Sequence, residues 1–441
     1  MRTPALFLLA AIACAGPAPL PAPKAPPRCE AEGFLQTGAA EATAIATDAE
    51  GGMVVAGTFR GSIGSRGQVV ESAGGEDVFV ARRAPDGDLL WLRRLGGTTD
   101  DRAAAVLLTP DGDAVVAGGV GERCVVARFA PDGTQKWGTR LEGDGESICR
   151  ALALAKDGAI WTAAAYRGTL KGGVASKGST DVLVMRLAGD SGATTFSRTF
   201  GGKNSEIPRS IAVDGTGRVL IGGQFAGEGD VEFSQVDFGR GPVKSNGDYD
   251  AFLLQLGLDG KTEWAQTFGD TGDDDVNAVV PGPGGAIYVA GHMMPHADYR
   301  GIAASQVGNF IAYVAKFTRD GRREWLTTLP AQSSLANALS VDDQGRLWTA
   351  GTFKGEMKAI GVRSSPPGKY DGFVALIDPA KGTVLGGQSF GGPDTETVRA
   401  LAPVPSGGMA IAASTRSQIT PCGRPFGTDG QQTAFVLILR Q

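Results

Sequence analysis

Short runs of apolar residues return along the chain at similar intervals, and each ends in a small residue, as in residues 54–57 (VVAG) and 115–118 (VVAG). The last residue of each run, here called the marker residue, lies at Gly57, Gly118, Ala164, Gly223, Gly291, Gly351 and Ala413. Successive differences between these positions are 61, 46, 59, 68, 60 and 62 residues. Runs of this length between turn-forming residues predict strands, and their recurrence indicates seven copies of one supersecondary unit.

Each unit reads as four strands joined by two tight turns and longer loops. A strand of small apolar residues, such as residues 151–154, leads through a turn (Asp157-Gly158) to the run with the marker residue. A long polar loop follows, and a third strand begins at an Asp such as Asp250, which we expect to accept backbone N–H groups in the turn before it. A second Asp-Gly turn, suited to a positive φ, precedes the fourth strand. Four residues after its glycine lies an aromatic, at Trp91, Trp137, Trp264 and Trp325.

Four antiparallel strands in each of seven units predict an all-β fold, a seven-bladed β-propeller. The small residues of the first strand fit the crowded axis, and the aromatics fit the wider rim. The last unit ends after residues 434–439, which form only its third strand, and residues 29–37 precede the first complete unit. We expect this N-terminal segment to complete the last blade, because a closed ring has no unpaired edge.

Residues 77–97 and 250–269 carry the pattern of Asp, an apolar strand, Asp-Gly, Trp and a terminal glycine. They resemble the seven-bladed β-propeller repeat family of bacterial exported proteins, and the resemblance extends from about residue 29 to the end. Blades two and five depart from it, since Arg123 and Ile311 stand where Asp is expected. The resemblance implies the fold and an exported location but no single activity. The Asp-Gly and Trp spacing is also similar to quinoprotein-type propeller repeats, which usually form eight blades. These occur in quinone-dependent dehydrogenases and in an outer-membrane assembly lipoprotein.

The N-terminus has the pattern of a targeting segment, with Arg2 before an apolar run at residues 5–13. Residues 11–14 resemble the lipobox of bacterial lipoproteins, although Ala11 replaces the usual leucine. We therefore expect a signal peptide at residues 1–13, lipidation of Cys14, and a Pro/Ala-rich tether over residues 14–28. The propeller would occupy residues 29–441. No acidic residue directly follows Cys14, and in lipoproteins of this kind that favours the outer membrane, on the periplasmic or the cell-surface side. The alternative is an ordinary secretory signal cleaved after Ala13 or Ala15.

Four further cysteines, Cys29, Cys124, Cys149 and Cys422, permit three connectivities, and export allows disulfides. Cys124 begins the third strand of blade two and Cys149 precedes the first strand of blade three, so both lie at the same end of their blades. We therefore expect a Cys124–Cys149 bond and, by elimination, Cys29–Cys422. Free thiols are the alternative.

The lengths of the loops predict which face of the propeller binds a partner. Connections from first to second and from third to fourth strand are tight, whereas the other connections are longer and share one face, here called the long-loop face. On it an acid precedes the first strand and Arg or Asn follows. This pattern occurs at Glu146 and Arg150, Glu206 and Arg209, Asp273 and Asn277, and Glu396 and Arg399. These pairs either form a polar ring that captures a ligand at the axis, or are salt bridges and loop caps that serve the repeat.

Two loops contain candidate metal ligands. Asp270, Asp273 and Asp275 offer carboxylates for Ca²⁺, without the spacing of an EF-hand. His292 and His296 flank two methionines, a donor set suited to copper. The alternative is a solvated loop in each case.

Composition narrows the function. A net charge of −5 spread along the chain provides no basic footprint for nucleic acid, and no apolar run is long enough to span a bilayer. The two histidines share one loop, which leaves few options for a Ser-His-Asp arrangement. We expect a monomeric, non-enzymatic binding or scaffold module for a protein or glycan partner, held to the membrane by its lipid alone. The alternatives are a scaffold in outer-membrane assembly and a quinoprotein-type enzyme.

Overall fold

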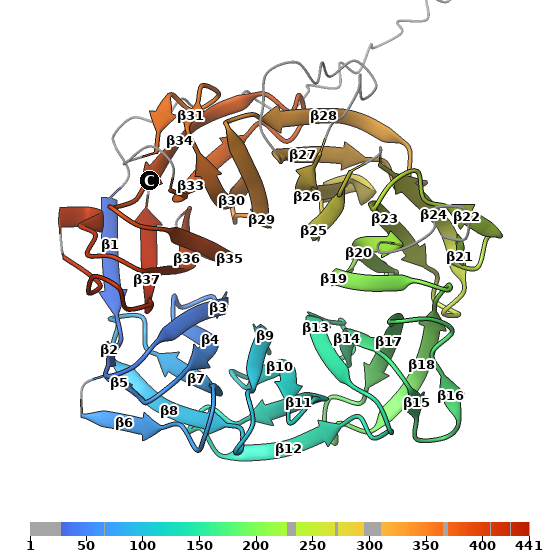
Figure 1. The fold of residues 1–441 in the computed structure, drawn as a ribbon, viewed down its shortest axis with the longest axis horizontal. Coiled ribbons are helices and arrows are strands. Elements are labelled where there is room, and N and C mark those ends of the chain that lie inside the picture. Colours follow the sequence, from blue (N-terminus) through green and yellow to red (C-terminus); the bar gives the residue numbers. More distant parts are fainter. Residues whose placement is uncertain are drawn as a thin grey trace, which may run out of the picture.

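Seven four-stranded antiparallel sheets surround a central axis in the computed structural model, as the sequence predicts (Figure 1). The structure describes residues 28–65, 67–226, 235–269, 272–294, 310–364, 369–405, 407–423 and 425–440. The expected signal peptide, Cys14 and all but the last residue of the expected tether lie outside the described residues.

The strands of each blade follow one another from the axis outwards. Blades one to three comprise β3 (Ala40–Thr47), β4 (Met53–Phe59), β7 (Asp77–Arg83) and β8 (Leu89–Leu95); β9 (Arg102–Leu108), β10 (Ala114–Val120), β11 (Arg123–Phe129) and β12 (Gln135–Arg140); β13 (Ser147–Leu154), β14 (Ile160–Tyr166), β17 (Asp181–Leu187) and β18 (Thr194–Phe200). Blades four to six comprise β19 (Ser205–Val213), β20 (Val219–Ala226), β23 (Tyr249–Leu256) and β24 (Thr262–Phe268); β25 (Asp275–Pro281), β26 (Ile287–Met293), β27 (Ile311–Phe317) and β28 (Arg323–Leu329); β29 (Ser333–Val341), β30 (Leu347–Lys354), β33 (Asp371–Ile377) and β34 (Val384–Phe390).

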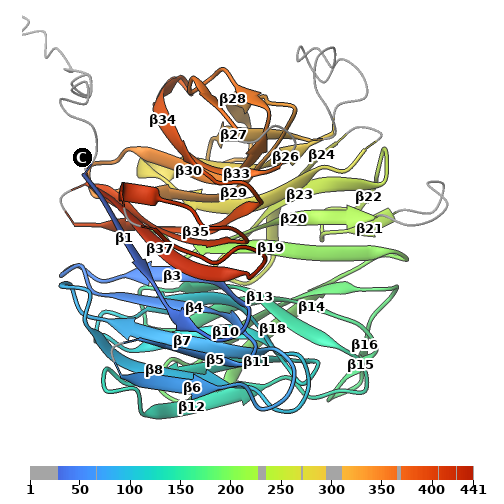
Figure 2. The same cartoon turned by 60° about the vertical axis from the view of Figure 1, so that its left-hand side comes forward.

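The seventh blade closes the ring with both ends of the chain. It comprises β35 (Glu396–Val404), β36 (Gly408–Thr415), β37 (Thr433–Arg440) and, outermost, β1 (Arg28–Gly33). β1 pairs antiparallel with β37, with Cys29 opposite Leu439, and the two strands lie side by side in Figures 1 and 2. A Cys29–Cys422 disulfide joins the closing strand to the loop before β37. The predicted closure and the predicted bond are both confirmed.

The first strand of every blade contains a β-bulge at the same place. In β3, for example, Ala42 and Ala44 pair with adjacent residues of β4, and Thr43 between them is left out of the ladder. The residues left out, here called the bulge residues, are Thr43, Ala104, Arg150, Arg209, Asn277, Asn337 and Arg399. A bulge bends its strand and changes the direction of a side chain.

The bulge explains the small marker residues. A Cβ atom on Gly57 would lie 2.0 Å from the Glu41 carbonyl oxygen, and one on Gly351 would lie 1.8 Å from that of Leu335. In both blades this carbonyl belongs to the residue two positions before the bulge. The same close approach recurs at Gly118, Gly223 and Gly291. Blades three and seven have Ala164 and Ala413 there, so in these two blades the position accommodates a single methyl group.

The aromatics of the fourth strands join neighbouring blades at the rim, as expected. Trp91 Nε1 donates to the Pro131 carbonyl at 2.8 Å, in the tight turn of the next blade, and a Cβ on Gly133 of that turn would lie 2.8 Å from the indole. Trp137 makes the same contact with Gly189 and Gly192. Phe196 packs against Gly260 in the same way. The turn glycine therefore provides both a positive φ and space for the neighbour's aromatic ring.

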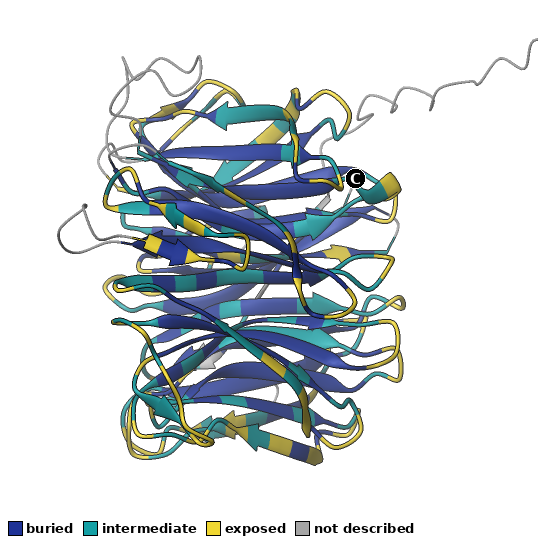
Figure 3. Ribbon diagram, turned by 90° about the vertical axis from the view of Figure 1, so that its right-hand side faces the viewer, coloured by how far each residue is buried: buried dark blue, intermediate teal, exposed yellow. Residues whose placement is uncertain are grey.

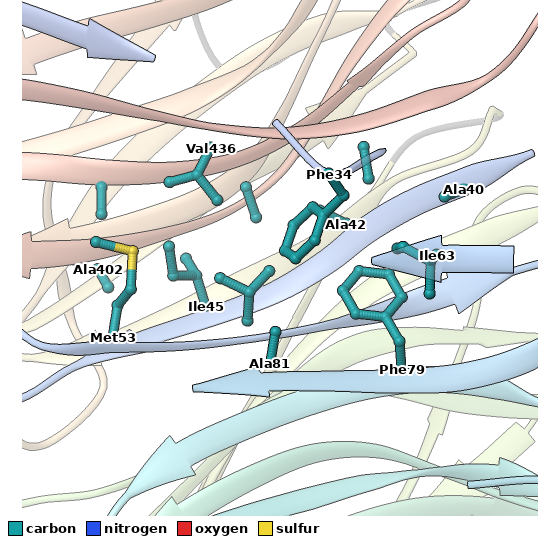
Figure 4. Packing of buried hydrophobic residues seen from close by; sticks show 14 of the residues in the cluster. Phe34, Ala40, Ala42, Ile45, Met53, Ile63, Phe79, Ala81, Ala402 and Val436 are labelled. Carbon is teal, nitrogen blue, oxygen red and sulfur yellow. The ribbon is translucent and has the colours of Figure 1, made fainter. Parts of the chain in front are cut away.

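Most strand residues are buried, and most exposed residues lie in the loops (Figure 3). One core cluster joins the last blade to the first. In it Phe34 lies 5.1 Å from Phe79 between ring centroids, and Ile45 and Val436 pack beside them (Figure 4).

Several long loops contain small hairpins that were not predicted from the sequence. These are β5 (Ser62–Ser65) with β6 (Gln68–Glu71), β15 (Thr169–Leu170) with β16 (Val174–Ala175), β21 (Gln235–Asp237) with β22 (Pro242–Lys244), and β31 (Glu356–Met357) with β32 (Val362–Arg363). β2 (Leu35–Gln36) pairs with β5, and two short 3-10 turns lie at η2 (Pro283–Gly285) and η3 (Pro421–Gly423).

Deleting residues 29–37 should prevent stable folding. The deletion exposes the edge of β37 and removes a strand whose hydrogen bonds contribute ~1 kcal/mol each, against a total stability of ~5–15 kcal/mol. We expect aggregated or proteolysed protein on size-exclusion chromatography. A Cys29→Ser, Cys422→Ser double variant tests the disulfide bond while keeping the strand. Its free energy of unfolding, measured with urea, should fall by ~2–5 kcal/mol, yet it should still elute as a folded monomer. Normal elution and melting of the deletion variant would contradict closure by β1.

Candidate functional site

A cavity of about 520 Å³ lies on the axis, where the first strands begin on the long-loop face. All seven bulge residues line it. They form one ring around the axis, here called the bulge ring, because each first strand has its bulge at the same height. Glu41 and Arg102, each two residues before a bulge, also line the cavity, together with Glu76 and Gln432.

Five bulge residues bind the next blade. Asn277 Nδ2 donates to the Ala336 carbonyl at 3.0 Å, and Asn337 Nδ2 donates to the Val398 carbonyl at 2.9 Å. Thr43 Oγ1 donates to the Ala103 carbonyl at 3.0 Å. These bonds run from one first strand to the next around the ring.

The two charged contacts use a carboxylate of the next blade. Arg209 Nε donates to Asp275 Oδ2 at 2.8 Å, and Arg399 Nε donates to Glu41 Oε1 at 2.6 Å. Both acceptors lie two residues before a bulge. Burial raises the pKa of Asp275 to about 6, against the opposing charge and hydrogen bond of Arg209. Arg209 and Arg399, which the sequence identified as candidates, therefore form ion pairs between blades. Their partners are Asp275 and Glu41, not the acids Glu206 and Glu396 that precede them in their own blades.

Arg150 differs from the other two arginines of the ring. Its Nε–H is buried and has no acceptor, and among the described residues the side chain makes no hydrogen bond or ion pair. Burial lowers the pKa of Arg150, and the nearby charges of Arg209 and Arg102 lower it further. The ring therefore holds one guanidinium without a carboxylate.

The four predicted acids lie outside the cavity lining. Glu206 Oε2 accepts the Gly202 N–H at 2.8 Å, and Glu396 Oε2 accepts the Gly392 N–H at 3.0 Å. Each caps the glycine-rich connection that enters its own blade. Glu146 is half-exposed and pairs with Arg167 at 2.6 Å.

Burial changes the ionisation of these acids. It raises the pKa of Glu206 to about 8, with a further contribution from Asp181, and that of Glu396 to about 7. Burial also raises the pKa of Asp273, as does the neighbouring charge of Asp248. Glu206 is therefore largely a neutral carboxylic acid at pH 7.

The repeated Asp at the start of the third strand has the expected role in the turn. Asp181 Oδ2 accepts the Lys177 N–H at 3.0 Å, and Asp250 Oδ2 accepts the Asn246 N–H at 2.8 Å. A Cβ on Gly201 would lie 2.0 Å from the Asp181 carboxylate, and a similar close approach occurs for Gly96, Gly269 and Gly391 against their aspartates, which explains the glycine at the end of these four units.

The candidate metal ligands do not assemble into a site in the described part of the chain. Asp275 is engaged by Arg209, and His292 Nδ1 lies 3.2 Å from Asn277 Nδ2. Burial, with the charge of Arg209, lowers the pKa of His292 to about 4, so its ring is neutral at pH 7. Asp270 and His296 lie outside the described residues. Among those described, no three His, Cys, Asp or Glu side chains are grouped to hold a metal ion.

The second predicted disulfide is confirmed: Cys124 and Cys149 are bonded, with 4.6 Å between their Cα atoms. The bond joins blades two and three beside the ring. No helix in the described ranges is long and apolar enough to cross a membrane.

Thr43, Ala104 and Asn337 of the ring were not predicted from the sequence, nor were the roles of Glu41 and Asp275 as acceptors. The bulge residues could have been found from the sequence, because each lies fourteen positions before the marker residue of its blade, as Asn337 does before Gly351.

Two solved structures are similar to this chain. The chain is similar to the Pan2 WD40 domain of Neurospora crassa, with 12% identity, a TM-score of 0.47, and 92% of this chain and 95% of that chain covered. It is also similar to a puromycin hydrolase, with 13% identity and a TM-score of 0.50 over 90% of this chain. The match spans 54% of the hydrolase chain, about half its length. At such identities the likeness concerns the fold alone. No family model matches the chain, and no curated protein matches it.

Glu206→Gln should flatten the pH dependence of stability. The unfolded state releases the Glu206 proton near its ordinary pKa of about 4.5, whereas the folded state keeps it until about pH 8. The protonated Glu206 side chain therefore contributes stability that is fully present below about pH 4.5 and is lost as the pH rises from there to about 8. Glutamine keeps an acceptor for Gly202 and has no proton to lose, so the melting temperature should fall less between about pH 5 and pH 8 than in wild type. The exposed Glu50→Gln is the control, and parallel curves for Glu206→Gln and wild type would contradict the assignment.

Proposed function

We propose that this protein is an exported, lipid-anchored binding module of the outer membrane, which contacts a protein or glycan partner through its long-loop face. The axial cavity is the centre of the contact. The bulge ring carries the proposal, because seven strands from all parts of the chain each turn one side chain into the same cavity.

Ala104 shows that the bulge itself needs no polar side chain, since blade two forms it with a methyl group. Polar and charged groups at the other six positions therefore have a separate cause. Hydrogen bonds and ion pairs to the next blade account for five of them. Arg150 remains, and its side chain is available to a ligand.

Photo-crosslinking in intact cells tests the choice of face. A photoreactive amino acid at Ala39, which lines the cavity, should give an adduct of higher mass. The same amino acid at Asp132, exposed in a tight turn on the opposite face, is the matched control and should give none. Equal adducts at both positions, or none at Ala39, would overturn the proposal.

Fractionation tests the anchor. Cys14→Ser removes the only proposed lipid attachment, so the variant should move from the membrane fraction to the soluble fraction, while wild type stays with the membrane. Wild type and variant that both fractionate as soluble protein would show that the chain carries no such anchor.

A further inference from the structure

We propose that the axial cavity binds a single carboxylate group presented by a protein partner, and that Arg150 binds it. The inference rests on the proposed function and adds the chemistry of the group that is recognised.

A rule of the ring identifies the site. Where a bulge residue is arginine, its acceptor lies two positions before the bulge of the next blade: Asp275 for Arg209, and Glu41 for Arg399. For Arg150 this position is Ile207 in β19. An isoleucine therefore stands at the one joint where the arginine has no internal carboxylate.

The charges of the cavity match a monovalent anion. Arg102, Arg150, Arg209 and Arg399 line it. Three carboxylates oppose them: Glu76 lies 3.6 Å from Arg102, and Asp275 and Glu41 bind the other two. Four positive charges less three negative ones leave one, on Arg150. A guanidinium binds a carboxylate through two parallel hydrogen bonds, whereas a dianion would be repelled by the three acids nearby.

An arginine with a buried, unpaired Nε is costly to the folded state unless a ligand compensates it. Residues that are unfavourable in the free protein are typical of binding sites. Among the described residues that line the cavity none is aromatic, so it offers no stacking face for a sugar ring, and a protein carboxylate fits better than an acidic glycan.

Titration calorimetry on the mature wild-type chain tests the ligand. The probe is N-acetylglycylglycine, whose only charge is its carboxylate, and the matched control is its amide. The acid should bind and the amide should not. Binding of the amide with equal affinity would overturn the inference, and tighter binding of galacturonate or inorganic phosphate would overturn the assignment to a protein carboxylate.

Three variants test the residue. Arg150→Gln removes the guanidinium, and Ile207→Glu supplies the missing internal carboxylate while keeping Arg150. Both should weaken binding of the acid at least tenfold. Arg167→Gln, at an ion pair outside the cavity, should bind as wild type does. Binding by Arg150→Gln as tight as in wild type would overturn the inference.

Melting without ligand separates a binding role from a structural one. Arg150→Gln should not lower the melting temperature, because it removes an unpaired charge. Ile207→Glu should raise the melting temperature, because it gives the Arg150 guanidinium a carboxylate partner. A fall for Arg150→Gln as large as that for Arg209→Gln would mean that Arg150 is structural and would overturn the inference.

The two proposals fail separately. If the Ala39 adduct persists in Arg150→Gln, the proposed binding face stands, but the proposal that the partner is bound through a carboxylate is overturned. If carboxylate binding depends on Arg150 but no Ala39 adduct forms, the anion site stands, but the proposal of a macromolecular partner at this face is overturned.

Discussion

One main-chain hydrogen bond between neighbouring blades determines where every first strand begins. Three residues before each bulge, a backbone N–H donates to the carbonyl of a residue that precedes or begins the third strand of the blade before it. The donors and acceptors are Ala40 and Gln432, Asp101 and Glu76, Ser147 and Glu122, Glu206 and Thr180, Asp274 and Tyr249, Ser334 and Phe310, and Glu396 and Tyr370, with distances of 2.6 to 3.0 Å. Seven equivalent bonds place the seven strands at one height, so the bulges form a ring.

The marker residues and the cavity both depend on this alignment. Once the strand is fixed at its start, the bulge three residues later brings a carbonyl against the second strand, and a small residue is required there. The bulge side chain is at the same time directed to the axis. Strand pairing, the glycine pattern and the chemistry of the axial cavity are therefore consequences of one geometry rather than separate features.

The sequence was informative wherever a feature repeats locally. The seven units, the closing strand and both disulfides follow from turn signals, strand patterns and the ends of the last unit. The partners in the ring did not follow, because the sequence pattern pairs Arg209 with Glu206 of its own blade, whereas the acceptor is Asp275 in the next blade. The acid in the same blade caps a glycine instead. The small hairpins in the loops were missed since their strands are only two to four residues long.

Repetition gives a way to separate structural from functional residues. A need of the fold recurs at several joints and is met there by equivalent contacts, as the rim aromatics and the capping acids show. Arg150 occupies the same bulge position as Arg209 and Arg399 but lacks a carboxylate acceptor, because Ile207 occupies the acceptor position. The bulge does not require the arginine, since Ala104 forms the same bulge in blade two. A side chain that the fold neither requires nor satisfies, in a cavity that six other strands help to form, is best explained by something outside the chain.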